Sequence, residues 1–187
     1  MEVIKPYLED VIAAARAVDL TEIDRAIRLF EQCYHEDRAV YVIGNGGSAA
    51  AASHFAQDLS KGSMPDLEGR RLRVVALTDN TAYLTATAND LGYDRVFDVQ
   101  LRALARPGDV LVAISGSGNS PNIVKAATYA RSVHSTVVGV TGFDGGKLLG
   151  LSDIRLHVPI MDMCKSEAVH GILLHMVSDI LRLRLRG

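Results

Sequence analysis

Two short glycine- and serine-rich runs in this sequence have the composition of loops that bind phosphate. Residues 44–48 read Gly-Asn-Gly-Gly-Ser, and residues 115–120 read Ser-Gly-Ser-Gly-Asn-Ser. Each follows an apolar, β-rich run and precedes a segment with helical spacing of apolar residues. Glycines let the backbone approach an anion, and the N–H groups and dipole of a following helix favour negative charge. One such loop is a weak signal, but two predict a phosphorylated ligand held from two sides.

The expected phosphate and sugar ligands come from both loops. They are Asn45, Gly46, Gly47 and Ser48 in the first loop, and Ser115, Gly116, Ser117 and Ser120 in the second. The three hydroxyl groups of the second loop suit the three oxygens of a phosphate. Two ordinary tight turns are the alternative, which is credible for either loop alone and less so for both.

A histidine and a carboxylate stand four residues apart beyond the first loop. At this spacing His54 and Asp58 share one face of a helix, about 6 Å apart. Such a pair can share a metal ion or act as a base and an acid. A polar surface stripe has the same spacing, but the phosphate loop directly upstream favours a functional role.

The first loop also fits a relaxed dinucleotide-binding pattern, glycine-x-glycine-x-x-alanine. That pattern needs an acidic residue about 20 positions further on, at the end of the next strand. Here the next predicted strand ends near Asp79, more than thirty positions on. The spacing therefore disfavours a nicotinamide cofactor, and the sequence has no Gly-Lys-Ser/Thr loop of the Walker type.

The elements that must hold these residues alternate between strands and helices from residue 39 onward. The patterns predict strands at residues 39–43, 73–77, 110–115, 136–141 and 154–158, helices at 48–60, 81–90, 94–105, 121–134 and 165–183, and turns at 106–109 and 142–146. This alternation predicts an α/β fold with a mostly parallel sheet covered on both sides. Ligands of such sheets bind at the carboxyl ends of the strands, where both loops lie.

The sequence pattern of residues 1–37 differs from that of the rest of the chain, because it predicts helices and no strand. An apolar face from Ile23 to Cys33 marks one helix, for which Thr21 is the expected N-cap. We expect these residues to form an N-terminal helical extension of a single domain that spans residues 1–187.

Composition narrows the function classes. The 187 residues are 48% hydrophobic, which is enough for a real core, and the net charge of −2 points to neither nucleic acid nor a membrane surface. Two cysteines without metal-type spacing suggest a reduced, cytoplasmic protein. The sequence shows no signal peptide and no apolar span of about 20 residues, so we expect it to be soluble.

With both loops placed, the chain resembles the sugar isomerase (SIS) domain family, and within it the phosphoheptose isomerase branch. The motifs are the leading helical pair, residues 44–48, His54-Phe55-Ala56, Asn89-Asp90, residues 115–120, residues 141–147 and a final helix with His175. The resemblance implies a flavodoxin-like three-layer α/β/α sandwich with a five-stranded parallel sheet. It also implies a homotetramer that packs through the N-terminal helices, with active sites at subunit interfaces and a divalent metal, usually zinc.

The resemblance assigns roles to single residues. His54 and His175 match metal-binding positions, and His175 is also catalytic. Asp58 stands where the family has a glutamate that is both a ligand and a general acid/base. Glu167 stands where the family usually has a glutamine ligand. Asp90 matches a residue that contacts sugar hydroxyls.

The resulting metal ligand set is His54, Asp58, Glu167 and His175. Two neutral imidazoles and two carboxylates neutralise a divalent ion and suit zinc. Eight residues on a straight helix span about 12 Å, which is too far for Glu167 and His175 to share one ion. We therefore expect Glu167 to lie before the helix or reach back, or the ligands to come from different subunits. His170 lies about 140° from His175 around the helix and is expected to be a packed histidine.

The implied reaction is aldose–ketose isomerisation through an enediol, with sedoheptulose 7-phosphate and D-glycero-D-manno-heptose 7-phosphate as the expected pair. Asp58 and His175 are the acid/base candidates, and the metal would polarise the carbonyl and hydroxyl groups. The two loops would hold the distal phosphate, so that its binding energy orients the reacting end.

Two other functions stay open. A non-catalytic branch of the family binds the replication initiator protein. The full ligand set argues against that branch, although the residues at 58 and 167 weaken the argument. An isomerase of another ketose phosphate would share the same motifs, because loops such as residues 62–73 set the size of the pocket.

Overall fold

A five-stranded sheet with strand order β2-β1-β3-β4-β5 lies at the centre of the protein, and every pair of neighbouring strands is parallel. The computed structural model describes residues 2–62 and 69–186. The strands are β1 (Ala39–Gly44), β2 (Arg73–Ala76), β3 (Val110–Ser115), β4 (Thr136–Thr141) and β5 (Ile154–His157). All five predicted strands are confirmed to within a residue at each end. Of the loop at residues 62–73, residues 63–68 lie outside the described residues.

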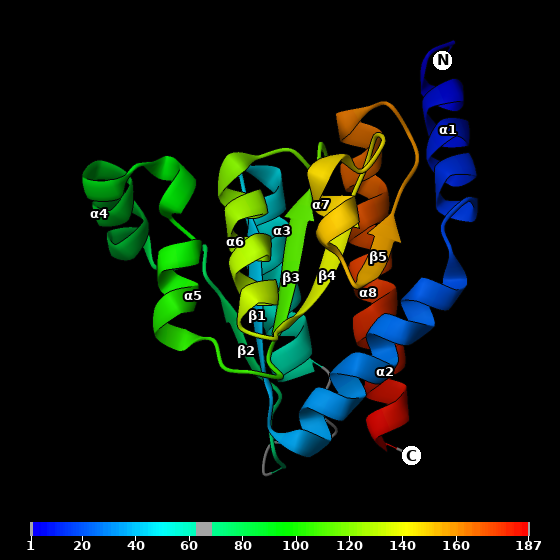
Figure 1. Ribbon diagram of the computed structural model, residues 1–187. Coiled ribbons are helices and arrows are strands. Elements are labelled where there is room, and N and C mark those ends of the chain that lie inside the picture. Colours follow the sequence, from blue (N-terminus) through cyan, green and yellow to red (C-terminus); the bar gives the residue numbers. More distant parts are fainter. Residues whose placement is uncertain (1, 63–68, 187) are drawn as a thin grey trace.

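Helices cover both faces of this sheet (Figure 1). The α-helices of the described residues are α1 (Ile4–Arg16), α2 (Leu20–Glu36), α3 (Gly47–Gln57), α4 (Thr81–Leu91), α5 (Asp98–Leu104), α6 (Pro121–Ser132), α7 (Gly146–Leu151) and α8 (Met163–Arg186), of which α1 packs on α8 and α4 on the turn that follows it. Successive residues of a strand point to opposite faces, so Val40 and Val42 join a buried cluster with α2, α3 and α8. Tyr41 and Ile43 join a second cluster with α5, α6 and α7. The predicted three-layer α/β/α sandwich is confirmed.

Several local predictions need correction. The N-cap of α2 is Asp19, whose carboxylate accepts a hydrogen bond from the Thr21 N–H at 2.8 Å, so Thr21 is not the cap. The helix expected to follow the first loop ends in a π-helical turn, η1 (Asp58–Gly62). Residues 146–151 form the short helix α7, which is too brief to show a period in the sequence. The last helix runs longer than expected, from Met163 to Arg186.

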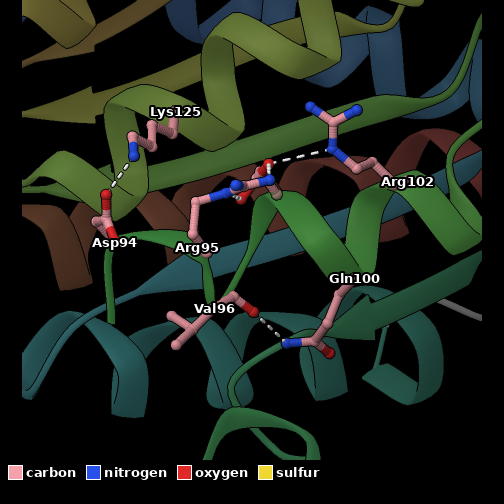
Figure 2. Close-up of polar contacts among 7 residues, drawn as sticks. Asp94, Arg95, Val96, Gln100, Arg102 and Lys125 are labelled. Atoms are coloured by element: carbon pink, nitrogen blue, oxygen red, sulfur yellow. Dashed lines mark hydrogen bonds and ion pairs between the residues drawn. The ribbon is translucent and has the colours of Figure 1, made fainter. Parts of the chain in front are cut away.

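The helix predicted at residues 94–105 is divided into a 3-10 turn, η2 (Tyr93–Arg95), and α5. Buried Asp98 begins α5 and accepts hydrogen bonds from Arg95 and Arg102. Burial raises the pKa of Asp98, but these two guanidinium groups outweigh it and leave the pKa below its ordinary value. Figure 2 shows Gln100 reaching back to the Val96 carbonyl and Lys125 reaching from α6 to Asp94. These contacts anchor the junction between α4 and α5 against α6.

No helix within the described ranges combines the length and the hydropathy that crossing a bilayer requires.

Candidate functional site: a hydroxyl-lined pocket and a histidine–carboxylate cluster

The two glycine- and serine-rich loops lie next to each other because β1 and β3 are adjacent in the sheet. Together they line a pocket of about 150 Å³ at the carboxyl ends of these strands. Its lining residues are Asn45, Ser48, Ile114, Ser115, Gly116, Ser117, Ser120, Met163 and Glu167. Seven of these nine residues are among those that the sequence singled out, and they now share one concavity.

The backbone of both loops is shaped for this pocket. Gly46 has a φ of 54° and directly precedes α3. Ser48, in the first turn of α3, lines the pocket. Gly118 has a φ of 64°, and a Cβ atom there would come within 1.9 Å of the Gly145 carbonyl oxygen. The Ser115 hydroxyl accepts a hydrogen bond from the Gly118 N–H at 3.2 Å. A helix N-terminus and serine hydroxyls around one small cavity can hold a phosphate.

Glu167 lies in α8 and faces the start of α3. A Cβ atom on Gly47 would come within 2.9 Å of Glu167 Oε2, so a larger residue there would displace the Glu167 carboxylate. Glu167 is part of the helix proper, since α8 begins at Met163. The expectation that it precedes the helix is therefore wrong, and within one chain its carboxylate belongs to the hydroxyl-lined pocket.

Three other predicted site residues form a cluster where α3 and η1 pass α8. Asp58 Oδ2 lies 3.5 Å from His54 Nε2 and 3.7 Å from His175 Nε2. The two imidazole rings meet edge to face, with centroids 5.0 Å apart. The side chains of His54 and His175 are more than half exposed, whereas that of Asp58 is 21% exposed. Asp58 is also the first residue of the π-helical turn, a feature that is frequent at functional sites.

The donor atoms of this cluster fit a divalent metal. One ligand atom from each of the three residues can be chosen so that all lie within 4.8 Å of one another. Two neutral imidazoles and one carboxylate are a typical donor set for a catalytic zinc ion, which keeps a further position open for water or substrate. Among the described residues Glu167 is not part of this cluster.

Asp90 and His170 lie outside both groups. Asp90 lies on α4, where it lines a different hollow with Tyr83 and Leu91 and accepts a hydrogen bond from Asn89 at 2.8 Å. His170 is 2% exposed and, as expected, is a packed histidine. Neither of its ring nitrogens has a hydrogen-bond partner among the described residues.

Asn122 and Tyr93 belong to the surroundings of the pocket but were missed from the sequence. Both hydrogen-bond to the side chain of Asn45. Asn122 follows Pro121 in the first turn of α6, directly after the hydroxyl loop, and this position was a signal that could have identified it. No local pattern marks Tyr93.

Comparison with known proteins agrees with this fold. The sequence profile of the SIS domain matches residues 6–142, and the chain belongs to the SIS domain family. A phosphoheptose isomerase from Aliarcobacter butzleri is 39% identical over 181 residues, which cover 96% of this chain and 95% of the relative. One from Neisseria meningitidis is 42% identical over 158 residues, which cover 83% of this chain and 79% of the relative.

Solved structures place the chain more finely. The structure of a phosphoheptose isomerase from Neisseria gonorrhoeae matches with a TM-score of 0.88 and 37% identity, covering 96% of this chain and 97% of that one. A phosphoheptose isomerase from Francisella tularensis matches with a TM-score of 0.89 and 30% identity, covering 97% and 95%. Within the SIS domain family, the chain groups with the phosphoheptose isomerases.

Proposed function

We propose that this protein is an aldose–ketose isomerase of a sugar phosphate, with sedoheptulose 7-phosphate and D-glycero-D-manno-heptose 7-phosphate as its substrate and product. One observation carries the proposal: α3 and α8 each contribute to both the hydroxyl-lined pocket and the His54–Asp58–His175 cluster. Ser48 and His54 are six residues apart on α3, which corresponds to a rise of about 9 Å. An extended sugar phosphate can place its phosphate at one end of this span and its carbonyl at the other.

The chain's own residues would carry out the proton transfers. Isomerisation removes a proton from the carbon beside the carbonyl, forms an enediol and returns a proton to the neighbouring carbon. Asp58 and His175 are the acid/base pair, because Asp58 Oδ2 lies 3.7 Å from His175 Nε2 and both border a hollow of about 340 Å³. His54 Nε2 lies 3.5 Å from the same carboxylate oxygen. A zinc ion held by these three residues would act as a Lewis acid toward the substrate oxygens.

The distal phosphate would bind in the hydroxyl-lined pocket, through Asn45, Gly46, Gly47, Ser48 and the loop at residues 115–120. Binding energy gained there orients the reacting end of the sugar. Glu167 and Gly116 would border the sugar. A metal-ligand role for Glu167, and a sugar contact from Asp90, require a second copy of the chain at the site.

The proposal includes a homotetramer of single-domain chains, each spanning residues 1–187, with sites at subunit interfaces. The first helix supports this, because Ile4, Leu8 and Ile12 form an exposed apolar stripe at a spacing of four residues. Such a stripe favours burial against another copy of the chain. Both cysteines are free thiols, which supports a reducing, cytoplasmic location.

The decisive experiment combines metal analysis with substrate screening. The purified protein is analysed for bound divalent metals and then incubated with ketose phosphates of five to seven carbons, with products followed by NMR. We expect about one zinc or other divalent ion per chain, and turnover of sedoheptulose 7-phosphate. Turnover of a different ketose phosphate would change the substrate assignment. A lack of turnover with every substrate, even after metal addition, would overturn the enzyme assignment in favour of a non-catalytic family member.

A further inference from the structure

The side-chain amide of Asn45 is held in one orientation by a chain of hydrogen bonds. The Ile123 N–H can only donate, so the Asn122 atom that it contacts at 3.0 Å must be the carbonyl oxygen. Asn122 Nδ2 must then donate to Asn45, at 2.8 Å, and Asn45 Nδ2 donates back to Asn122 Oδ1 at 2.9 Å. This pairing joins the two loops of the pocket directly.

The hydroxyl group of Tyr93 also hydrogen-bonds to the side chain of Asn45. The Tyr93 hydroxyl donates to Asn45 Oδ1 at 2.9 Å. Among the described residues, these bonds satisfy the Asn45 oxygen twice and use one of the two N–H donors of its Nδ2. The second N–H donor is left for a ligand in the pocket that Asn45 lines.

Tyr93 is itself placed by the junction between α4 and α5. It is the first residue of η2, preceded by Gly92 at a φ of 98°, a conformation that favours glycine. The next two residues are fixed by polar contacts (Figure 2). Asp94 forms an ion pair with Lys125 of α6. Arg95 donates two hydrogen bonds to the buried Asp98. The tyrosine ring is largely exposed, so this anchored turn, rather than packing of the ring, directs its hydroxyl.

We propose that Tyr93 is a positioning residue that keeps the free N–H of Asn45 directed at the ligand's phosphate end. Tyr93 acts through Asn45 and has no part in the proton transfers. The ligand chemistry rests on the proposed function, whereas the hold on Asn45 does not. Loss of the hydroxyl should therefore weaken binding of the phosphate end and leave the chemical step unchanged.

The test compares Tyr93→Phe with the wild-type protein, and with Tyr129→Phe as the matched control. Tyr129 also lies beside this junction, but its hydroxyl makes no hydrogen bond among the described residues. Calorimetry with inorganic phosphate and kinetics with sedoheptulose 7-phosphate are measured for all three proteins. For Tyr93→Phe we expect a weakening of phosphate binding and a rise in KM of about three- to tenfold, as for loss of one hydrogen bond. The value of kcat should stay within about twofold, and Tyr129→Phe should match the wild type.

Crystal structures of the wild type and Tyr93→Phe separate this inference from the proposed function. Because the two bonds to Asn122 remain, we expect the Asn45 side chain to keep its amide orientation but to shift or become less ordered in the variant, whether or not the protein turns over a sugar phosphate. An unchanged Asn45 side chain, or equal phosphate affinities in wild type and variant, would overturn the positioning role. If the wild type binds no phosphate and has no activity, the proposed function fails, and the structures alone decide on Tyr93.

Discussion

The carboxylate of Glu167 lies against Gly47, at the first turn of α3, where an added Cβ atom would come within 2.9 Å of Oε2. The same turn borders the pocket that is expected to receive a phosphate. A carboxylate and a phosphate so close together repel each other unless a cation lies between them. The Glu167–Gly47 contact therefore makes the charge at position 167 a determinant of phosphate affinity.

Replacing Glu167 by glutamine removes that charge while keeping the shape of the side chain. We expect Glu167→Gln to bind inorganic phosphate several-fold more tightly than the wild type, measured by calorimetry. Glu31→Gln, a change of the same charge on α2, should leave the affinity unaltered. Metal analysis of the same variant tests whether Glu167 is also a metal ligand. A metal content equal to that of the wild type would exclude this role, and a clear loss of metal would support a site shared between subunits.

The cluster of His54, Asp58 and His175 should be required for turnover. We expect Asp58→Asn and His175→Gln each to lower kcat at least 100-fold, because each removes a general acid or base, and to lower the metal content. Asp24→Asn, which makes the same chemical change on α2, should retain wild-type activity. Full turnover in both site variants would refute the assigned mechanism.

The buried histidine His170 should make the protein less stable in mild acid. Burial lowers the pKa of His170 below its ordinary value, so the unfolded chain takes up a proton more readily than the folded one. The folded state therefore keeps its full stability at pH values above about 6.5, the pKa of a histidine in the unfolded chain. As the pH falls below that value, the unfolded chain binds a proton and the free energy of unfolding decreases.

Denaturant unfolding measured between about pH 7 and pH 5 tests this expectation. His170→Gln should reduce the slope of unfolding free energy against pH, whatever its effect on stability at pH 7. His35→Gln, the same substitution at an exposed histidine, is measured alongside as the control. Equal slopes in wild type and His170→Gln would contradict the argument.

The apolar stripe on α1 should control assembly. Leu8 is 57% exposed in the single chain and lies between Ile4 and Ile12 on that stripe. We expect the wild-type protein to have a mass in solution of about four times the 20.2 kDa of one chain, as measured by light scattering. Leu8→Ser should lower this mass, because the tetramer dissociates into smaller species. Leu104→Ser changes another exposed leucine, at the end of α5, and should leave the assembly intact. A wild-type protein that is monomeric would contradict the tetramer directly.

The fold could be predicted because its signals are local. The five strands are short runs of apolar, often β-branched residues, and strands such as β1 and β3 are buried along their whole length. Both glycine- and serine-rich loops were predicted at the carboxyl ends of a parallel sheet, whereas their adjacency rests on the pairing of β1 with β3. The pairing of His54 with Asp58 followed from their helical spacing.

The remaining parts of the site depend on contacts between distant segments. Helical spacing gave the distance between Glu167 and His175 along α8, but it could not show that Glu167 packs on Gly47 of α3. At the break between η2 and α5, Gln100 donates both to the carbonyl of Val96 and to that of Leu77, which follows β2. The orientation of Asn45 depends on Tyr93 and Asn122, which no pattern near Asn45 reveals.

The reciprocal bonds between Asn45 and Asn122 join residues 77 positions apart. During synthesis on the ribosome, a nascent chain that ends before β3 has one wall of the binding pocket and lacks the other. It also leaves one edge of β1 without its neighbouring strand, because β3 pairs directly with β1. A chain that ends there cannot form the complete pocket, and its unpaired apolar strand would be prone to aggregation.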